Sequence, residues 1–249
     1  MRLRVLGSNG TYPTAGRPAS GYLVTGSFGS LMLDLGPGVA MALAELMDPA
    51  DLDAVVISHS HPDHCSDLFS LVNLLSFGPA HRAPLPVFAP ADVFDRFSGF
   101  YGGGPDHRMF RVLDARPVTA GDSHGLGGAV IRFGGAVHPV PSLVTRVEAD
   151  GAAITYSGDT GPGGDLESLA AGADVALVEA TSQGTPAGDR YPYHLFAEEA
   201  GGLAARAGVR HLVLTHLAPT LVPERSAAEA AEAFSGPITV AVPGLAIDV

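Results

Sequence analysis

The run of residues 58–64, Ser-His-Ser-His-Pro-Asp-His, constrains the fold of this chain more than any other feature. It directly follows the apolar run 54–57, Ala-Val-Val-Ile, which predicts a buried strand. Side chains two residues apart share one face of a strand, so we expect His59 and His61 to point the same way. Pro62 suits the first turn of a helix, because the N–H that proline lacks is not needed there. The run therefore predicts a strand that leads directly into a helix.

This motif carries four side chains of the types that bind zinc and similar metals. They are His59, His61, Asp63 and His64. Two alternatives compete with a pair of metals: a surface loop that is rich in histidine, and a structural site for a single metal. Four such side chains at this spacing, at a junction of strand and helix, favour two metals over either alternative.

Length and composition indicate a globular protein with a large core. The chain has 249 residues, 46% of them hydrophobic, and we expect one domain over residues 1–249. No run approaches the ~20 apolar residues that cross a bilayer, and residues 1–7 indicate a strand rather than a signal peptide. The single cysteine, Cys65, excludes an internal disulfide, so we expect a cytoplasmic location. Cys65 itself is expected to be a small buried side chain rather than a ligand or a nucleophile.

The formal net charge of -12 argues against a nucleic-acid substrate. Sequence-independent affinity for nucleic acid comes from Lys and Arg side chains that neutralise phosphates. A large RNA would need a local basic patch, and the sequence has no dense run of Lys or Arg. A small substrate is therefore favoured.

Strand and helix patterns alternate along both halves of the chain, without a repeat or a long linker. Two strand-rich halves, each with helices, predict an α/β protein of two stacked sheets that helices cover on the outside. The turn Asp150-Gly151 has a sequence that hairpins favour. Strands are expected over residues 2–6, 21–25, 30–35, 53–57, 85–88, 130–133, 143–149, 152–157, 174–179, 211–215 and 238–242. Helices are expected over residues 39–47, 91–100, 195–207 and 224–234, and from the motif through 68–75.

A two-metal site needs more donors than the motif supplies, and three further candidates follow predicted strands, where loops converge on sites. They are His138, Asp159 and His216. Taken singly, each has an ordinary explanation: an exposed turn, an Asx turn or a half-buried imidazole. Their joint occurrence, in the order His, Asp, His behind the four-ligand motif, favours metal ligands.

His194 stands at the predicted start of the helix 195–207, directly after Tyr191-Pro192-Tyr193. A helix N-terminus lowers the pKa of an imidazole and helps to hold an anion nearby. We therefore expect His194 to donate a proton or to steady an oxyanion, with an aromatic cluster that caps the helix as the alternative. The other histidines are expected at the surface: His81, His107, His124 and His211.

The motifs resemble those of the metallo-β-lactamase superfamily, through residues 58–64, His138, 156–160 and 214–217. Within it, the chain is similar to the ribonuclease Z-like branch, and more closely to the bacterial cyclic nucleotide phosphodiesterases called atypical class II. The segments that carry this closer similarity are 7–10, 19–23, 194–201 and 204–209.

The resemblance implies an αβ/βα four-layer sandwich, the metallo-β-lactamase fold, with the site at one sheet edge. It implies two divalent metal ions, zinc first, with manganese or iron as alternatives. One ion would be held by His59, His61 and His138, and the other by Asp63, His64 and His216. Asp159 would bridge the two, Asp63 and His194 would be the catalytic residues, and the protein would be a homodimer.

Two departures from the family pattern bear on the substrate. The long basic arm with which tRNA-processing members grip tRNA has no counterpart here, and residues 240–245 lack the acidic residues of the phosphodiesterase group. Ser142 and Thr160 could contact phosphate, although ordinary loop hydrogen bonds explain them equally well. We expect metal-dependent hydrolysis of a small phosphodiester, with cyclic nucleotides first. The alternatives are a tRNA 3′-end endonuclease, a hydrolase of esters, lactones or thioesters, and a metal-binding protein without activity.

Overall fold

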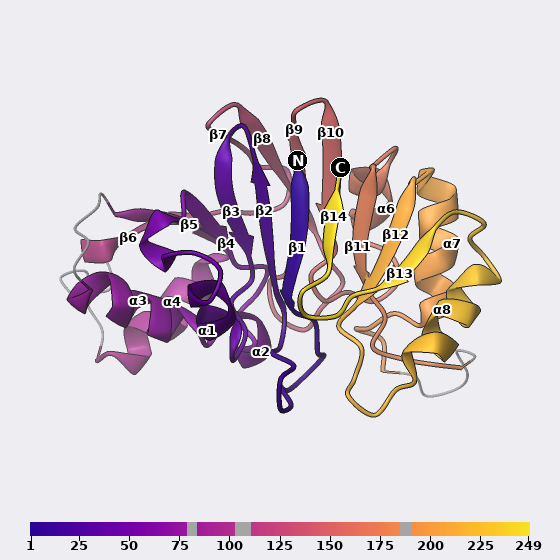
Figure 1. Cartoon of the computed structure of the whole chain (residues 1–249), viewed down its shortest axis with the longest axis horizontal. Helices are drawn as coiled ribbons and strands as arrows, with labels where there is room; N and C mark the ends of the chain where they lie inside the picture. Colours follow the sequence, from indigo (N-terminus) through magenta and orange to yellow (C-terminus); the bar gives the residue numbers. More distant parts are fainter. Residues whose placement is uncertain (79–83, 103–110, 185–190) are drawn as a thin grey trace.

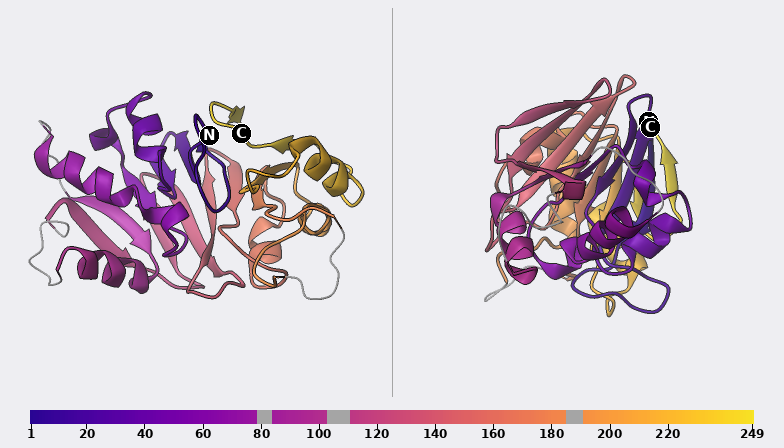
Figure 2. Two further views of the ribbon diagram at one scale, coloured as in Figure 1. Left: turned by 90° about the horizontal axis from the view of Figure 1, so that it is seen from below. Right: turned by 90° about the vertical axis from the view of Figure 1, so that its left-hand side faces the viewer.

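Two mixed seven-stranded sheets stack face to face, and each is covered on its outer side by helices (Figure 1). The structure, a computed structural model, describes residues 1–78, 84–102, 111–184 and 191–249. Two views at right angles show the same order of layers, with each half of the chain forming one side (Figure 2). The predicted αβ/βα sandwich is confirmed. His81 and His107 lie outside the described residues.

The first half of the chain supplies most of the first sheet, whose strand order is β14-β1-β2-β3-β4-β5-β6. Its strands are β1 (Arg2–Gly7), β2 (Gly21–Gly26), β3 (Gly29–Leu33), β4 (Ala54–Val56), β5 (Leu85–Ala89), β6 (Leu113–Pro117) and β14 (Ala246–Asp248). The described helices on this side are α1 (Val39–Ala44), η1 (Pro49–Asp51), α2 (Pro62–Cys65), α3 (Leu68–Phe77) and α4 (Ala91–Phe100).

The second sheet has the strand order β13-β12-β11-β10-β9-β8-β7. Its strands are β7 (Ser123–Leu126), β8 (Ala129–Gly135), β9 (Leu143–Ala149), β10 (Ala152–Tyr156), β11 (Val175–Glu179), β12 (His211–Thr215) and β13 (Ile238–Val240). The described helices on this side are α6 (Leu166–Ala170), α7 (Ala197–Ala207) and α8 (Pro223–Ala231).

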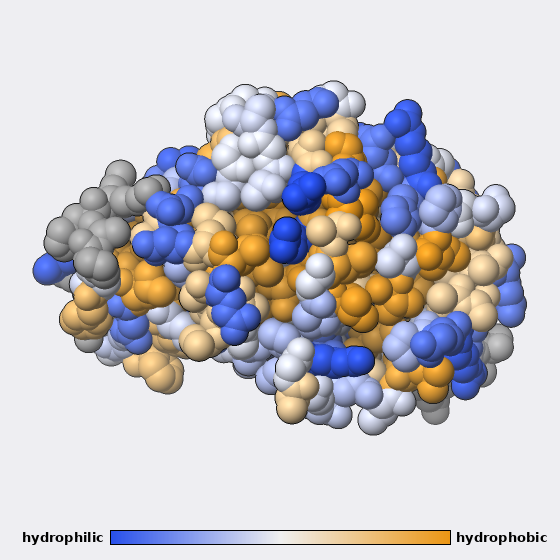
Figure 3. Space-filling model, viewed as in Figure 1, coloured by the Kyte–Doolittle hydropathy of each residue, from blue (hydrophilic) through white to orange (hydrophobic). Residues whose placement is uncertain are grey.

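Hydrophobic side chains fill three layers, one between the sheets and one beneath the helices on each side. At the centre, the buried rings of Tyr22 and Tyr156 approach from the two sheets, with their centroids 5.0 Å apart. The face in Figure 3 also exposes hydrophobic residues across its middle. Within the described part of the chain, none of the helices has the length and apolar character needed to span a bilayer.

The topology brings six loops to one edge of the sandwich. Strands β3 to β6 run parallel in the first sheet, and strands β10 to β13 run parallel in the second. The carboxyl ends of parallel strands meet at one sheet edge, so the loops that follow them lie together. Near α2 (Figure 1), the loops after β3, β4, β8, β10, β11 and β12 bring their polar residues together.

The strands that sequence patterning missed lie at the margins of the sheets. β6, β7 and β14 are edge strands, and the fourth edge strand, β13, ends at Val240 instead of residue 242. An edge strand has a neighbouring strand on one side only. It lacks the apolar runs by which inner strands are recognised. The five-residue helix α6 was also missed. The hairpin at Asp150-Gly151 is confirmed, because both residues have positive φ, as a type I′ turn requires.

The prediction of a single helix that continues from the motif is wrong, because the structure has two helices there, α2 and α3. Asp67 lies at the division, where its N–H donates to the carbonyl oxygen of Leu35 and its carboxylate accepts from the N–H of Ala40. These two bonds tie the junction of α2 and α3 to the loop after β3 and to α1. Three other predicted helices are shorter than expected, since α1 ends at Ala44, α7 begins at Ala197 and α8 ends at Ala231.

Cys65 is buried within α2, as predicted, with 5% of its surface exposed. Its Sγ donates to the carbonyl oxygen of His61 at 3.2 Å, and burial raises the pKa of the thiol to about 12. We expect Ellman's reagent to leave this thiol unmodified in the folded protein and to modify it fully in guanidinium, because the thiolate is the reactive form. Rapid modification under native conditions would contradict this assignment.

Candidate metal centre

Seven side chains that the sequence singled out converge at the shared edge of the sheets, in two groups. The first group contains His59, His61 and His138. The second contains Asp63, His64, Asp159 and His216. Within each group, one ligand-type atom per residue lies within 4.8 Å of the others. Five of the seven members lie in the loops after β4, β8, β10 and β12, and the other two, Asp63 and His64, lie in α2.

The first group consists of three imidazoles whose nitrogens face one another. His61 Nδ1 lies 3.1 Å from His59 Nε2 and 3.0 Å from His138 Nε2. Donors at tetrahedral positions around zinc, each 2.0–2.1 Å from the ion, lie about 3.3 Å apart. The two separations from His61 Nδ1 are close to this spacing, and all three ring nitrogens lie within 4.8 Å of one another, which fits a metal ion.

The second group surrounds Asp159, whose side chain is buried. Its Oδ1 lies 3.1 Å from His64 Nε2 and 3.4 Å from His216 Nε2. Its Oδ2 lies 3.9 Å from His59 Nε2, so the carboxylate faces both groups. Oδ1 has no hydrogen bond of good geometry, and a buried carboxylate oxygen in that state needs a positive partner. A divalent cation is a partner that fits this carboxylate.

Asp63 completes the second group from the start of α2. Its Oδ2 lies 3.2 Å from His216 Nε2 and 3.6 Å from His64 Nε2, and it accepts the N–H of Thr11 at 3.0 Å. His216 directly follows β12 with a φ of 54°. A non-glycine residue rarely adopts this left-handed conformation, although histidine does so more often than most.

The strand that precedes the motif, β4, ends at Val56, three residues before His59, so the argument that a strand aligns His59 and His61 is wrong. The backbone of His59 instead pairs with Ser142 in an isolated bridge between the two sheets, and the following turn brings His61 round. The loop, and not the alternation of a strand, places both rings on one side.

Asp34 was not singled out by sequence, yet it anchors the motif. It is fully buried directly after β3, with a φ of 59°. Its carboxylate accepts from Ser58 N at 2.6 Å, from Ser58 Oγ at 2.8 Å and from the Tyr156 hydroxyl at 2.6 Å. It also lies 2.7 Å from His64 Nδ1, and a proton held there leaves Nε2 to face the second group. His59 Nδ1, 3.0 Å from Ser58 Oγ, is held through the same carboxylate.

Replacing Asp34 with alanine is expected to lower the free energy of unfolding by about 3–5 kcal/mol, because it leaves several buried donors unpaired. Asp34→Asn should cost less, since an amide can still accept from Ser58 and adopts positive φ readily. Urea denaturation of both variants tests this order. Equal stability of Asp34→Ala and the parent would contradict the anchoring role.

A third cluster, not grouped by the sequence, lies beside His216 and contains Glu179 and His194. Glu179 is fully buried at the end of β11, and its Oε1 lies 2.8 Å from His194 Nδ1. Its Oε2 accepts from Thr181 Oγ1 at 2.7 Å, and Thr181 Oγ1 in turn lies 2.9 Å from His216 Nδ1. One carboxylate thus orients both histidines, and its place at the end of a buried strand was the available sequence signal.

His194 lies three residues before α7 and not at its start, so the helix N-terminus does not govern its pKa. Burial alone would lower that pKa, but the hydrogen bond and charge of Glu179 outweigh it and raise the pKa. The His194 ring stacks on those of Tyr191 and His216. Gly161 packs so closely under this loop that a Cβ there would overlap the carbonyl oxygen of Pro192.

Burial and the neighbouring charges together set the protonation of the donor groups. It lowers the pKa of His59 well below its usual range and the pKa of His138 to about 4, so both rings are neutral. Burial would raise the pKa of Asp159, but His216 and His64 hold it well below its ordinary value. Burial would also lower the pKa of His64, yet the facing carboxylates, Asp159 first, raise it. Neutral imidazole and ionised carboxylate are the forms that bind metal, and His59, His138 and Asp159 have those forms. His64 would release its Nε2 proton when a metal binds.

Several smaller predictions have different outcomes. Ser142 Oγ donates to the carbonyl oxygen of Asp159 at 3.2 Å, and Thr160 is a buried loop residue, so ordinary loop hydrogen bonding accounts for both. His124 and His211 were expected at the surface, but both are half-buried. The first packs against two phenylalanine rings, and the second lies 2.9 Å from the Thr239 hydroxyl.

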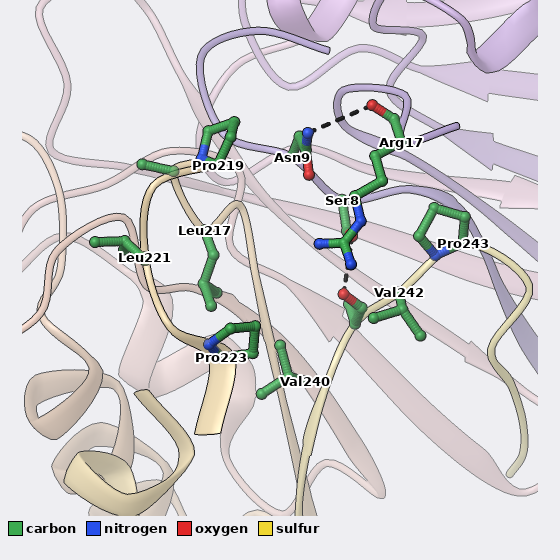
Figure 4. A pocket seen from close by; sticks show the side chains of 12 residues that line it. Ser8, Asn9, Arg17, Leu217, Pro219, Leu221, Pro223, Val240, Val242 and Pro243 are labelled. Carbon is green, nitrogen blue, oxygen red and sulfur yellow. Dashed lines mark hydrogen bonds between the residues drawn. The ribbon is translucent and has the colours of Figure 1, made fainter. Parts of the chain in front are cut away.

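A hollow beside the loop 8–18 is too small to be a substrate site (Figure 4). Its volume is about 30 Å³, room for one or two water molecules. Asn9 Nδ2 donates to the carbonyl oxygen of Arg17 at 3.4 Å, and Ser8 Oγ donates to that of Ala241 at 2.9 Å. These bonds fix the loop that also holds Asp63.

Comparison with known proteins places the chain in a family. A model described as "Beta-lactamase superfamily domain" matches residues 31–217. The chain belongs to the metallo-β-lactamase superfamily. Its place in that superfamily is the ribonuclease Z-like branch, and it is a metallo-hydrolase. The predicted membership is confirmed, and the clustered donors together with the family indicate binding of divalent metal.

Three relatives illustrate the similarity. An uncharacterized protein of Mycobacterium leprae is 37% identical over 256 residues, covering 100% of this chain and 89% of that protein. Ribonuclease Z of Mycobacterium bovis is 32% identical over 267 residues, covering 96% of this chain and 95% of the enzyme. The crystal structure of YhfI, a metallo-β-lactamase fold protein of Bacillus subtilis, aligns with a TM-score of 0.88 at 26% identity, covering 99% of this chain and 98% of YhfI.

Proposed function

We propose that this protein hydrolyses a small phosphodiester with two divalent metal ions, and that cyclic nucleotides are its first candidate substrates. The observation that carries the proposal is the pair of donor groups that both face Asp159. In this proposal one ion is held by His59, His61 and His138, and the other by Asp63, His64 and His216, with Asp159 between them. Asp63 therefore serves catalysis as a ligand, and residues 1–249 act as one hydrolase domain.

The ions are proposed to be zinc, with manganese or iron as alternatives, because imidazole and carboxylate donors suit all three. When bound, two such ions act as Lewis acids that lower the pKa of water towards neutrality and offset the charge of a phosphodiester. The chain's own contribution is to fix the imidazole rings so that their outer nitrogens face the metal positions. Asp34 does this for His64, and Thr181 does it for His216.

His194 is proposed as the proton donor to the departing oxygen. Glu179 accepts a hydrogen bond from Nδ1 of His194. It thereby keeps the His194 ring beside the ring of His216, with the ring centroids 5.8 Å apart. Proton donation of this kind is typically worth roughly 10²–10⁴-fold in rate. Because Glu179 is buried, it holds the His194 ring in one orientation, so the proton donor has a fixed position relative to the substrate.

Two observations support a phosphodiester over a carbon ester and a small substrate over RNA. The name of the 32%-identical relative, ribonuclease Z, denotes an enzyme that cuts phosphodiester bonds in RNA. That relative also supports a ribonuclease as the second candidate function, which corresponds to the tRNA 3′-end endonuclease named as an alternative above. The net charge of -12 and the sequence's lack of a long basic arm favour a small substrate instead.

A substrate panel with added Zn²⁺ or Mn²⁺ tests the proposal. We expect hydrolysis of 3′,5′-cyclic AMP that a chelator abolishes and added metal restores, with little cleavage of a precursor tRNA. A lactone and p-nitrophenyl acetate cover the acyl alternative. Preferred cleavage of the tRNA or of an acyl substrate would replace the proposed substrate class. If none of these substrates were turned over with added metal, the alternative of a metal-binding protein without activity would be favoured.

The resemblance also leads us to propose a homodimer in the cytoplasm. Sedimentation equilibrium of the purified protein measures the first, and fractionation of cells that express the full-length gene measures the second. A monomer at micromolar concentration would contradict the dimer.

A further inference from the structure

A groove opens directly beside the candidate metal centre, between the start of α4 and the loop that joins β8 to β9. It has a volume of about 680 Å³, within the range of ~300–1,000 Å³ that is usual for sites of small ligands. His138 and Ser142 form part of its wall, so the groove is continuous with the donor groups. A molecule that reaches the centre from this side must lie in the groove.

The walls of the groove are largely apolar. Their apolar members include Val118, Ala120, Pro139, Val140 and Pro141. Apart from His138, the ionisable groups among the described residues that line the groove are two carboxylates, Asp92 and Asp95. They stand three residues apart on α4 and therefore share one face of the helix. Two carboxylates at the wall disfavour a second phosphate and favour an uncharged group that carries N–H or O–H donors.

The two carboxylates have different surroundings. Asp92 Oδ2 accepts from Ser60 Oγ at 2.6 Å and lies 3.6 Å from Arg96 Nε, so Asp92 is tied to the loop that bears His59 and His61. Asp95 is exposed and forms no ion pair or hydrogen bond within the described parts of the chain. The second oxygen of Asp92, Oδ1, is unpaired but buried, so Asp95 is the exposed carboxylate that a ligand can reach.

We propose that this groove holds the nucleoside portion of the substrate and that Asp95 accepts hydrogen bonds from its base or ribose. The inference rests on the proposed phosphodiesterase function and specifies its substrate as a nucleotide with a single phosphate. Apolar walls pack against the flat faces of a base, and a carboxylate recognises its amino group or the ribose hydroxyls. A strand of RNA would place further phosphates against the same carboxylates, and the charge repulsion disfavours its binding.

A variant that fills the groove tests the location. Ala120 is exposed on the wall, so Ala120→Phe adds a ring there without entering the core. We expect the KM for 3′,5′-cyclic AMP to rise roughly 10-fold or more, because lost contacts in a pocket typically cost that much. Turnover of methyl p-nitrophenyl phosphate, which has no nucleoside, should change little. Ala228→Phe, on the exposed face of α8, is the matched control.

A charge change tests Asp95. Asp95→Arg is expected to raise the KM for cyclic AMP and to improve cleavage of a 5′-phosphorylated dinucleotide, since the carboxylate that disfavours the extra phosphate is gone. Asp95→Asn should show the first effect more weakly. Glu224→Arg makes the same change of net charge on an exposed residue of α8 and should leave both substrates unaffected.

Adenosine separates this inference from the proposed function. Calorimetry with the purified protein should detect adenosine binding that Ala120→Phe weakens and Ala228→Phe does not, whether or not any phosphodiester is cleaved. Absence of all phosphodiester turnover would overturn the proposed function. Cleavage of cyclic AMP with a KM that neither Ala120→Phe nor Asp95→Arg alters, together with unchanged adenosine binding, would overturn the groove as the nucleoside site.

Discussion

Asp159→Ala is expected to abolish phosphodiester hydrolysis and to remove most of the metal from the proposed centre. Asp159 is the one member whose two oxygens face the two donor groups, at 3.1 Å from His64 Nε2 and 3.9 Å from His59 Nε2. Its loss leaves buried imidazoles without the negative charge that would offset two cations. We expect metal content, measured by inductively coupled plasma mass spectrometry after dialysis, to fall from about two ions per chain to less than one.

A control is needed because a buried substitution could act through the fold. Asp114→Ala removes an exposed carboxylate that pairs with Arg116 on the edge strand β6, far from the donor groups. It should retain metal and activity. Circular dichroism of Asp159→Ala should match the parent protein, since Asp159 accepts few hydrogen bonds. Full activity of a folded Asp159→Ala after chelation and reloading with zinc would exclude the proposed bridging role.

The seven candidate ligands could be identified from sequence because each follows a recognisable apolar run. His216 directly follows the paired residue Thr215, and Asp159 lies three residues after the paired residue Tyr156, so local patterning placed both near strand ends. That such ends converge follows from parallel pairing, which is a general property of sheets. Their division into two groups came from the family resemblance and not from spacing, because the groups mix residues from both halves of the chain.

The residues that hydrogen-bond to the candidate ligands were harder to identify from sequence. Asp34 occupies a position that patterning assigned to the interior of a strand, and its function depends on contacts with Ser58 and Tyr156, which are distant in sequence. Glu179 reads locally as the polar end of a strand, and its partner His194 lies fifteen residues later. Long-range hydrogen bonds of this kind leave no periodic signature, so the polar network around a site emerges from tertiary structure.

His194→Ala is expected to slow hydrolysis of cyclic AMP by roughly 10²–10⁴-fold while metal content is retained, since His194 belongs to neither donor group that faces Asp159. The loss should depend on the leaving group. The ribose oxygen of cyclic AMP is a poor leaving group that needs a proton, whereas p-nitrophenolate departs readily without one. Methyl p-nitrophenyl phosphate should therefore be cleaved almost as fast by the variant as by the parent protein.

This contrast separates proton donation from a structural role of the His194 ring. A ring that mainly positioned His216 through their stacking, at 5.8 Å between centroids, would slow both substrates alike when removed. His211→Ala is the matched control, because His211 is a half-buried histidine on the strand that leads to His216. Measuring kcat for both substrates in the three proteins decides the question. Equal losses on cyclic AMP and on the p-nitrophenyl ester would rule out His194 as the proton donor.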